Sequence, residues 1–339
     1  MRVITCASYY GTGSSAVTDL FSEFDCIDSL GNYEYRFLQE PDGIADLEYN
    51  LIENRHRHNS SDAIKRYLRY LKMEKKMGYG GYDIFGKNLD TITKDYIDGL
   101  TELKTHTWCN KDRTDKGLFF CFLDRSYSIL RRLLTGNINT EKRFSLLKDR
   151  EWSYFTSISE EHFLALTREY VDMLLKSVVR EGSKYIMVDQ MVPPTNVSRY
   201  TRYFNDVKII VVERDPRDIY LLEKVKWQWG VIPVATPEEF VTWFKITRKN
   251  EDTEDSTKVY RLRFEDLVYN YEETKNKLIS FVGISKDNHS RPMTKFNPEM
   301  SINNTNMQKK IQGYEQDIKY IESHLSEYLY DFENHLEIV

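Results

Sequence analysis

The sequence has few features of a specialised protein class. Its four cysteines, Cys6, Cys26, Cys109 and Cys121, form no C-x-x-C pair, so neither a zinc site nor a disulfide framework is indicated. No apolar run approaches the ~20 residues that a membrane-spanning helix needs. The balance of 48 Lys+Arg against 53 Asp+Glu gives a net charge of -5, which argues against a nucleic-acid coat or a polybasic membrane protein. We expect a globular protein without a signal peptide, located in the cytoplasm.

Five apolar segments predict a single parallel sheet. They begin at Val3 and cover Cys26–Asp28, Lys184–Asp189, Lys208–Glu213 and Lys258–Phe264. Each is followed by a turn or a helical pattern, as expected for repeated βα units. The segments at Val3, Ile186 and Ile209 are expected in the centre of the sheet. The segment 258–264 alternates polar and apolar residues, which favours a place toward an edge.

The segment 46–182 differs from the rest because helical periodicity dominates it. Little of it is rich in Gly or Pro, so we expect a packed helical insertion that acts as an acceptor lid within one domain spanning residues 1–339. The expected fold is an α/β three-layer sandwich with a central parallel sheet. The expected helices are Asp62–Met77, Leu89–Leu103, Asp124–Leu134 and Glu160–Val179 in the insertion, and Asp266–Phe281, ending at Gly283, and Ile311–Leu329 after it.

The stretch Val3–Leu20, reading VITCASYYGTGSSAVTDL, predicts an anion site. An apolar strand breaks into a loop with Gly11 and Gly13, and two hydroxyls, Ser14 and Ser15, open a helix. Glycines allow close approach of the backbone, and the first N–H groups of a helix point at an anion such as phosphate. The pattern G-x-x-x-x-G-K-[ST] needs Lys after its last glycine, where this chain has Ser14. ATP hydrolysis and kinase chemistry are therefore disfavoured.

A second signal is VVERDPRDIY, residues 211–220. Arg214 comes at the carboxyl end of a predicted strand, and Pro216 then starts a turn. An arginine in that place points into the crevice where parallel sheets bind ligands, and its guanidinium can hold a phosphate by paired hydrogen bonds. The alternative is a surface cluster of ion pairs around the turn. The anion loop predicted near the N-terminus weighs against that alternative.

The segments YYGTGSS, VVERDPRD and VYRLRFEDLVYNYEETKNKLISFVGI, in this order, resemble the sulfotransferase family. The resemblance covers about residues 1–45 and 183–310. It implies a fold like that of the P-loop nucleotide kinases and the donor 3′-phosphoadenosine 5′-phosphosulfate (PAPS), with the bisphosphate PAP as product and no metal. Phe264, Glu265, Asp266 and Leu267 match the family's late strand–helix unit.

The resemblance also implies which residues bind the donor. The N-terminal loop would hold the 5′-phosphosulfate, and Arg214 would hold the 3′-phosphate. The segment 296–305 resembles the late loop that folds over the nucleotide, although an ordinary polar loop is an equal alternative. The donor-binding candidates are Gly11, Thr12, Gly13, Ser14, Ser15, Arg214, Ser301, Asn303 and Asn304.

Three positions depart from the family's pattern. Gly11 stands where the family often has a Lys that stabilises the leaving oxygen. Leu222 stands where a Ser usually contacts the 3′-phosphate, and Gln190 replaces a Lys expected after the strand that ends at Asp189. Because side chains that donate hydrogen bonds in the family are absent at these positions, we expect a lower affinity for the nucleotide or a lower rate of transfer.

The general base is expected in YEYRFL, residues 33–38. This segment resembles the K-E-x-H-F-F segment of glycosaminoglycan-type sulfotransferases, and it places Glu34 as base, with Arg36 where the family has His. Gln190, Ser14 and Arg36 are candidates for stabilising the developing charge. The alternatives are an exposed Glu34 without a role and a histidine base such as His106.

The sequence therefore favours a sulfotransferase that moves the sulfuryl group of PAPS to an acceptor hydroxyl. A carbohydrate or glycolipid acceptor is favoured, with no nucleic-acid partner and no membrane span. Two alternatives remain open: a P-loop kinase or phosphotransferase on the same fold, and a catalytically weakened relative that only binds the nucleotide.

Overall fold

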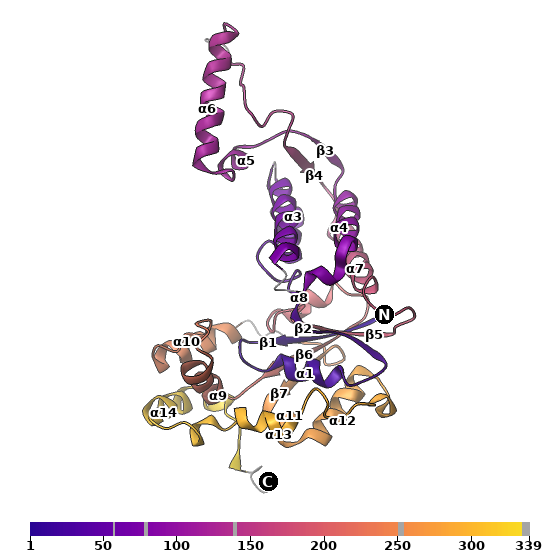
Figure 1. The fold of residues 1–339 in the computed structure, drawn as a ribbon, viewed down its shortest axis with the longest axis vertical. Coiled ribbons are helices and arrows are strands. Elements are labelled where there is room, and N and C mark those ends of the chain that lie inside the picture. Colours follow the sequence, from indigo (N-terminus) through magenta and orange to yellow (C-terminus); the bar gives the residue numbers. More distant parts are fainter. Residues whose placement is uncertain (57, 78–80, 138–140, 250–253, 334–339) are drawn as a thin grey trace. The chain divides into compact units, whose positions relative to one another are not determined.

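The computed structural model describes residues 1–56, 58–77, 81–137, 141–249 and 254–333. The chain forms two compact units (Figure 1). The first comprises residues 1–39, 77–86 and 171–339, and the second comprises residues 40–76 and 87–170. Among the described residues, no helix has both the length and the apolar character needed to cross a membrane.

The first unit is built on a five-stranded parallel sheet with the order β2-β5-β1-β6-β7. Its strands are β1 (Arg2–Ser8), β2 (Ile27–Glu34), β5 (Tyr185–Asp189), β6 (Val207–Glu213) and β7 (Val259–Arg263). All four pairings are parallel, so the carboxyl ends of the strands meet at one edge. The predicted parallel sheet is confirmed, with the segments at Val3, Ile186 and Ile209 central and β7 at an edge.

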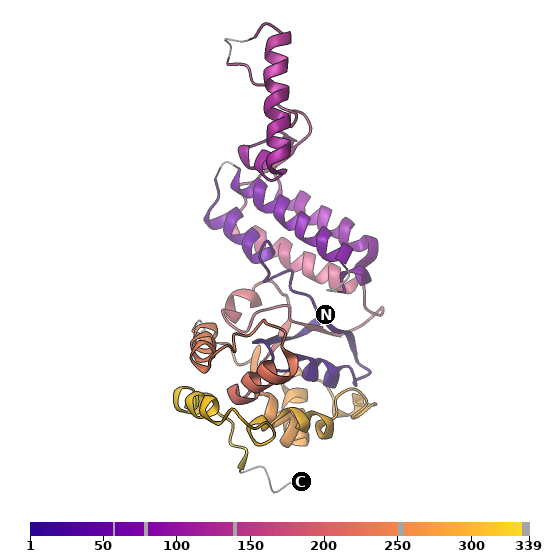
Figure 2. The ribbon, with the colours of Figure 1, turned by 60° about the vertical axis from the view of Figure 1, so that its left-hand side comes forward.

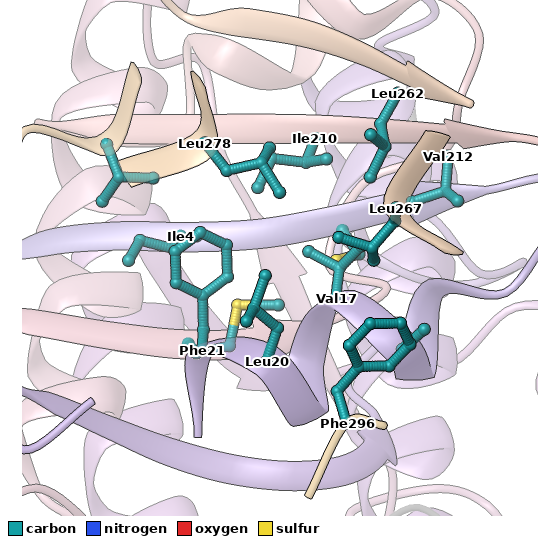
Figure 3. Close-up of a cluster of buried hydrophobic side chains, with 14 of the residues drawn as sticks. Ile4, Val17, Leu20, Phe21, Ile210, Val212, Leu262, Leu267, Leu278 and Phe296 are labelled. Atoms are coloured by element: carbon teal, nitrogen blue, oxygen red, sulfur yellow. The ribbon is translucent and has the colours of Figure 1, made fainter. Parts of the chain in front are cut away.

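Helix α1 (Ser14–Phe21) and helices α11 (Phe264–Tyr269) and α12 (Tyr271–Val282) cover one face of the sheet (Figure 3). Val17 and Leu20 from α1 meet Ile4 and Ile210 from the strands in one buried cluster. Helix α8 (Val197–Thr201) lies on the other side of the sheet from α1 (Figure 1). The sheet is thus flanked by helices, as the α/β prediction requires.

A second apolar cluster packs three helices beyond β6. They are α9 (Pro216–Leu221), α10 (Pro237–Arg248) and α14 (Glu315–His324). Leu222, the residue that replaces the family's serine, is fully buried in this cluster. It follows α9 in a π-helical turn, Leu222–Trp227. Leu222 therefore serves the core and is not available to a ligand.

The second unit contains three long helices that run side by side (Figure 2). They are α3 (Asn59–Met77), α4 (Gly86–Leu100) and α7 (Glu160–Lys176). Buried hydroxyls join them: Tyr170 is 2.9 Å from both Tyr67 and Thr93. The remaining elements are α2 (Ile44–Glu48), a π turn Tyr49–Glu53, the antiparallel pair β3 (Leu103–His106) and β4 (Trp152–Phe155), α5 (Asn110–Thr114) and α6 (Gly117–Leu134).

Several expected helices differ from the structure. Helix α4 ends at Leu100, because Leu103 pairs with Phe155 in β3. Helix α6 begins at Gly117 and not at Asp124, since its first turns carry exposed apolar side chains that a core-facing pattern does not predict. The helix expected over 266–281 is two helices with a break at Asn270, followed by a left-handed Gly283 that ends α12 as predicted.

The carboxyl-terminal part of the first unit contains short helical segments. Pro298–Ser301 is α13, and Ile302–Asn304 is a 3-10 turn. Helix α14 covers Glu315–His324, so the single helix expected over 311–329 is shorter than predicted. The further short turns are Tyr82–Phe85, Lys286–Asn288, Met307–Lys309 and Ser326–Tyr328.

Candidate functional site

The loop between β1 and α1 is a tight turn. Gly11 and Gly13 both adopt left-handed backbone conformations, with φ of 75° and 96°. The hydroxyl of the buried Thr12 donates to the carbonyl of Tyr9 at 2.8 Å, and the Thr12 amide donates to the same carbonyl. Thr12 therefore holds the shape of the loop, and the first amides of α1, at Ser14 and Ser15, open toward the carboxyl edge of the sheet.

Two aromatic rings occupy the space beside the loop glycines. A Cβ atom on Gly11 would lie 2.7 Å from the ring of Trp227, and one on Gly13 would lie 2.7 Å from the ring of Phe264. Both positions thus require glycine for two reasons, the positive φ and the adjacent ring. The two rings thus brace the loop from the protein side.

Arg214 lies between the same two rings at the carboxyl end of β6. Its Cζ is 5.7 Å from the centre of the Trp227 ring and 4.6 Å from that of Phe264. Its two terminal nitrogens donate to the carbonyls of Gly11, at 3.1 Å, and of Asn304. One buried side chain therefore joins the N-terminal loop to the late loop.

The guanidinium of Arg214 is buried and incompletely paired. Its Nε atom has no hydrogen-bond partner, and none of the carboxylates in the described residues forms an ion pair with it. Burial lowers the pKa of Arg214, and the nearby Asp218, Glu265 and Asp215 oppose this change. A buried cation with a spare donor is suited to an anionic ligand.

The carboxyls around Arg214 are themselves buried. Burial raises the pKa of Asp218 and that of Glu265 to about 7 each. Asp218 accepts hydrogen bonds from the amides of Asn306 and Met307, at 3.0 and 2.7 Å, and so fixes the end of the late loop. Glu265 accepts from the Asp215 amide at 2.7 Å. These carboxyls shape the two loops, and they are held by backbone amides.

Two lysines that the sequence did not single out lie near this end of the site. Lys310 donates to the carbonyls of Ile302 and Thr305, at 2.6 and 2.7 Å. Burial lowers the pKa of Lys310, Asp218 opposes this, and the charge of Lys226 lowers it further. Lys310 and Lys226 thus add positive charge beside the late loop.

A buried polar network lies behind the first turn of α1. The Ser14 hydroxyl donates to Asp189 Oδ2 at 3.3 Å, and Gln190 Nε2 donates to Ser14 Oγ at 3.2 Å and also to the Ser8 hydroxyl. Gln190 has a left-handed φ of 57°, which is uncommon for a residue with a side chain and is often associated with functional sites. The network joins the carboxyl ends of β1 and β5 to the first turn of α1.

Asp189 is the most perturbed group in that network. Burial first, and the negative charge of Glu34 second, raise its pKa to about 7, whereas Ser14 and Arg36 act in the opposite direction. Its Oδ1 atom is buried and has no hydrogen-bond partner. Near neutral pH, Asp189 is therefore present in both protonated and ionised forms.

Glu34 ends β2 in register with Asp189. Its carboxylate forms a 2.7 Å ion pair with Arg36, and the Arg36 Cζ lies 5.8 Å from the ring of Tyr10 in the N-terminal loop. Glu34 is exposed at the carboxyl edge of the sheet. The structure thus brings Glu34, Arg36, Gln190 and the N-terminal loop together within the first unit.

The other predicted residues have less defined positions. Ser15 is exposed in the first turn of α1, Ser301 is partly buried at the end of α13, and Asn303 is exposed next to Asn304. His106 lies in β3 of the second unit, with its ring 3.7 Å from that of Trp152. Among the described residues there is no group of three or more His, Cys, Asp and Glu arranged to hold a metal ion.

Arg217 in the same R-D-P-R turn has a structural role. It pairs with Asp215 at 2.7 Å and with Glu322 at 2.9 Å, and it donates to the carbonyl of Tyr330. All its contacts lie within the protein, so it cannot replace a missing phosphate ligand without breaking them. The alternative of a surface ion-pair cluster is not observed, because the pair of Arg217 and Asp215 is buried and Arg214 is outside it.

The sequence analysis missed Trp227, Lys226 and Lys310 as residues of the site. Their only sequence signal was proximity to motif segments. Trp227 ends the π-helical turn that follows α9, and Lys310 follows the late loop. Asp189 was recognised as a strand end, but its burial against Ser14 depends on the pairing of β1 with β5.

Comparisons with known proteins give weak likenesses. No family model matches the sequence, and no curated protein matches it. Among solved structures, the sulfotransferase domain from the Synechococcus PCC 7002 olefin synthase is 11% identical, with a TM-score of 0.42 over 98% of this chain and 95% of that chain. The sulfotransferase domain from the curacin biosynthetic pathway is 11% identical, with a TM-score of 0.38 over 97% and 98%. Sulfotransferase STF1 from Mycobacterium tuberculosis H37Rv is 9% identical, with a TM-score of 0.34 over 90% and 76%.

Proposed function

We propose that this chain is a sulfotransferase that moves the sulfuryl group of PAPS to a hydroxyl of an acceptor. The observation that carries the proposal is that the guanidinium of Arg214 is buried and its Nε atom has no hydrogen-bond partner. A buried guanidinium with a spare donor joins a glycine loop at a helix N-terminus to a second loop, in the crevice at the carboxyl ends of parallel strands. That crevice is where open α/β sheets bind their ligands.

The two ends of the crevice suit a ligand with two separate phosphate groups. We assign the 5′-phosphosulfate to the first amides of α1 and the hydroxyls of Ser14 and Ser15, where the helix dipole also favours an anion. We assign the 3′-phosphate to Arg214, with Lys310 and Lys226 adding charge. The exposed Trp229, which stacks on Trp227 at 4.8 Å, offers an aromatic surface for a base.

The acceptor end is assigned to Glu34. In the transfer, Glu34 takes the proton of the acceptor hydroxyl, the acceptor oxygen bonds to sulfur, and the bond between sulfur and the bridging phosphate oxygen breaks. PAP then leaves with the electron pair of that bond. Gln190 and Ser14 can donate hydrogen bonds to the charge that develops on the transferred group, and Arg36 holds Glu34 in place.

A carbohydrate or glycolipid hydroxyl is the acceptor class that we favour. Tyr33 is next to Glu34 in the chain and packs against Gly81, and the ring of Tyr10 lies 5.8 Å from Arg36 Cζ; both tyrosines are exposed. Sugar rings stack on such aromatic faces. The proposal is tested by incubating the protein with sulfur-labelled PAPS and a panel of glycans and glycolipids. Transfer that needs Glu34 supports it, and no labelled product from any acceptor contradicts it.

A phosphotransferase is the second candidate because Asp189 lies against Ser14. A carboxylate beside an anion loop can hold the magnesium of a nucleotide triphosphate. The raised pKa of Asp189 and the lack of Lys after Gly13 weigh against this. Thermal shifts separate the two: stabilisation by PAP without magnesium supports sulfuryl transfer, whereas stabilisation by Mg-ATP alone supports phosphoryl transfer.

A further inference from the structure

Helix α6 of the second unit carries a large exposed apolar surface. Leu118 is 90% exposed and Leu134 is 71% exposed, at opposite ends of the helix. Single exposed apolar residues are normal in globular proteins, but a contiguous set marks an interaction surface. We call this set the α6 apolar face, and it comprises Leu118, Phe119, Phe122, Leu130, Leu133 and Leu134.

The spacing of these residues places them on one side of the helix. At 3.6 residues per turn they fall within an arc of about 160°. Asp124 lies on the opposite side, where it is buried and accepts hydrogen bonds from the Ser145 hydroxyl at 2.9 Å and the Leu146 amide at 2.6 Å. The segment after α6 therefore packs on the polar side, and within the described residues of the second unit the apolar face is left to solvent.

Positive charge lies at one edge of the apolar face, at Arg125, and on the polar side of α6. Arg131 and Lys142 both lie over the ring of Phe144, at 5.6 and 5.5 Å, and Arg125 and Arg143 are exposed. Within the described residues, no carboxylate forms an ion pair with any of these four side chains. This local excess of cations contrasts with the net charge of -5 of the whole chain. It makes the surface complementary to an anionic partner.

A second copy of the chain fits this charge pattern poorly. The middle of α6 lies at Arg125 and Ser126. An antiparallel two-fold contact through the apolar face brings both Arg125 side chains, which border that face, to the same side of the contact. Like charges at such distances oppose association.

We propose that α6 docks on an anionic lipid bilayer. Its apolar face enters the boundary between headgroups and acyl chains, and its flanking Arg and Lys side chains contact the anionic headgroups, with the helix lying in the plane of the membrane. This proposal does not rest on the proposed enzymatic function, because it uses residues of the second unit only.

The test is flotation of the full chain with lipid vesicles. One set consists of phosphatidylcholine alone, and the other contains roughly a third phosphatidylglycerol. The variants are the pair Phe119→Glu with Phe122→Glu, and the pair Arg131→Gln with Lys142→Gln. Met73→Glu is the matched control, because Met73 is 51% exposed on α3 of the same unit. Circular dichroism checks that each variant folds.

We expect the wild type and Met73→Glu to bind the anionic vesicles equally, and to bind phosphatidylcholine much more weakly. The double Phe→Glu variant should bind at least about tenfold more weakly, because apolar burial is lost. Each lost cation should weaken binding by roughly fivefold, and added salt should weaken it further. Absence of binding to anionic vesicles, or equal binding by the double Phe→Glu variant, overturns the proposal. A dimer in sedimentation that the same variant dissociates, without vesicle binding, assigns the face to a second copy instead.

Discussion

The guanidinium of Arg214 donates a hydrogen bond to the main-chain carbonyl of Gly11, with the nitrogen and oxygen 3.1 Å apart. These residues are 203 positions apart in the chain. Because the same side chain also donates to the carbonyl of Asn304, an anion that binds Arg214 acts on the N-terminal loop and the late loop together. The predictions below test the parts of this arrangement.

Substituting Arg214 should weaken nucleotide binding. Arg214→Lys keeps the charge but loses the forked donors, so we expect the affinity for PAP to fall by about tenfold or more, and Arg214→Met should lower it further. Isothermal titration calorimetry measures the affinity, with Arg291→Lys, an exposed arginine, as the control. If folded Arg214→Met binds PAP as the wild type does, the assignment of the 3′-phosphate is wrong.

Glu34→Gln should lower the turnover number without affecting nucleotide binding. A general base contributes about 10²- to 10⁴-fold to the rate, and the amide cannot accept the proton. We expect kcat to fall within that range while the dissociation constant of PAP stays unchanged. Glu272→Gln, which removes an exposed carboxylate on α12, should be neutral in both assays. If kcat is unchanged in Glu34→Gln, another residue is the general base.

Gly11→Ala should damage the N-terminal loop. The new Cβ meets Trp227 at 2.7 Å, and φ at this position is 75°. We expect a loss of roughly 1–2 kcal/mol in the free energy of unfolding from the backbone alone, with a weaker affinity for PAP. Gly11→Lys should not raise the sulfuryl-transfer rate, for the same reason. Denaturant melts are the measurement, and adding Trp227→Leu to Gly11→Ala should recover only the steric part.

The affinity for PAP should depend on pH through Asp189. Its pKa of about 7 means that the carboxyl behind Ser14 is mostly neutral at pH 6 and ionised at pH 8. The ionised form repels a phosphate at α1, so we expect the wild-type affinity to fall as the pH rises, by up to roughly tenfold per pH unit above the pKa. In Asp189→Asn this dependence should disappear. At each pH, the wild-type affinity is divided by the affinity of Asp189→Asn, because the ionisation of PAP itself affects both affinities equally.

Ionisation of Asp189 should also lower the stability of the folded protein as the pH rises. The folded state holds the proton of this carboxyl more tightly than the unfolded state does, since its pKa is raised from 3.8 to about 7. The free energy of unfolding therefore falls as the pH rises through that interval, with a slope of up to about 1.4 kcal/mol per pH unit from one group. Thermal melts of Asp189→Asn should show a shallower decline. A decline equal to that of the wild type would contradict the raised pKa.

Much of the sheet was predictable because its strands are short apolar runs bounded by polar residues. The run at Lys208–Glu213 is observed as Val207–Glu213, and the alternation in Lys258–Phe264 correctly indicated an edge. The place of Arg214 at the carboxyl end of β6 was predictable for the same reason, since a strand end fixes the direction of the next side chain.

The bracing of the loop could not be predicted from the sequence. Its glycines indicated close approach of a ligand, yet the space beside them is filled by Trp227 and Phe264, which are more than 200 residues away in the chain. Contacts between residues so far apart in the chain are tertiary contacts, and no local sequence pattern predicts them. The exposure of the α6 apolar face could not be predicted either. A helical pattern of apolar residues is the same whether those residues pack in a core or face solvent.

The strand order has a consequence for synthesis of the protein. β1 is made before the other strands of the sheet, but both of its neighbours, β5 and β6, follow more than half the length of the chain later, at Tyr185–Asp189 and Val207–Glu213. Until the ribosome has released those strands, the amino-terminal loop has neither Asp189 nor Arg214 beside it. Such long-range pairing slows folding and leaves apolar strand edges unpaired in the nascent chain. The proposed anion site is thus assembled only late in translation, and an amino-terminal fragment cannot contain it.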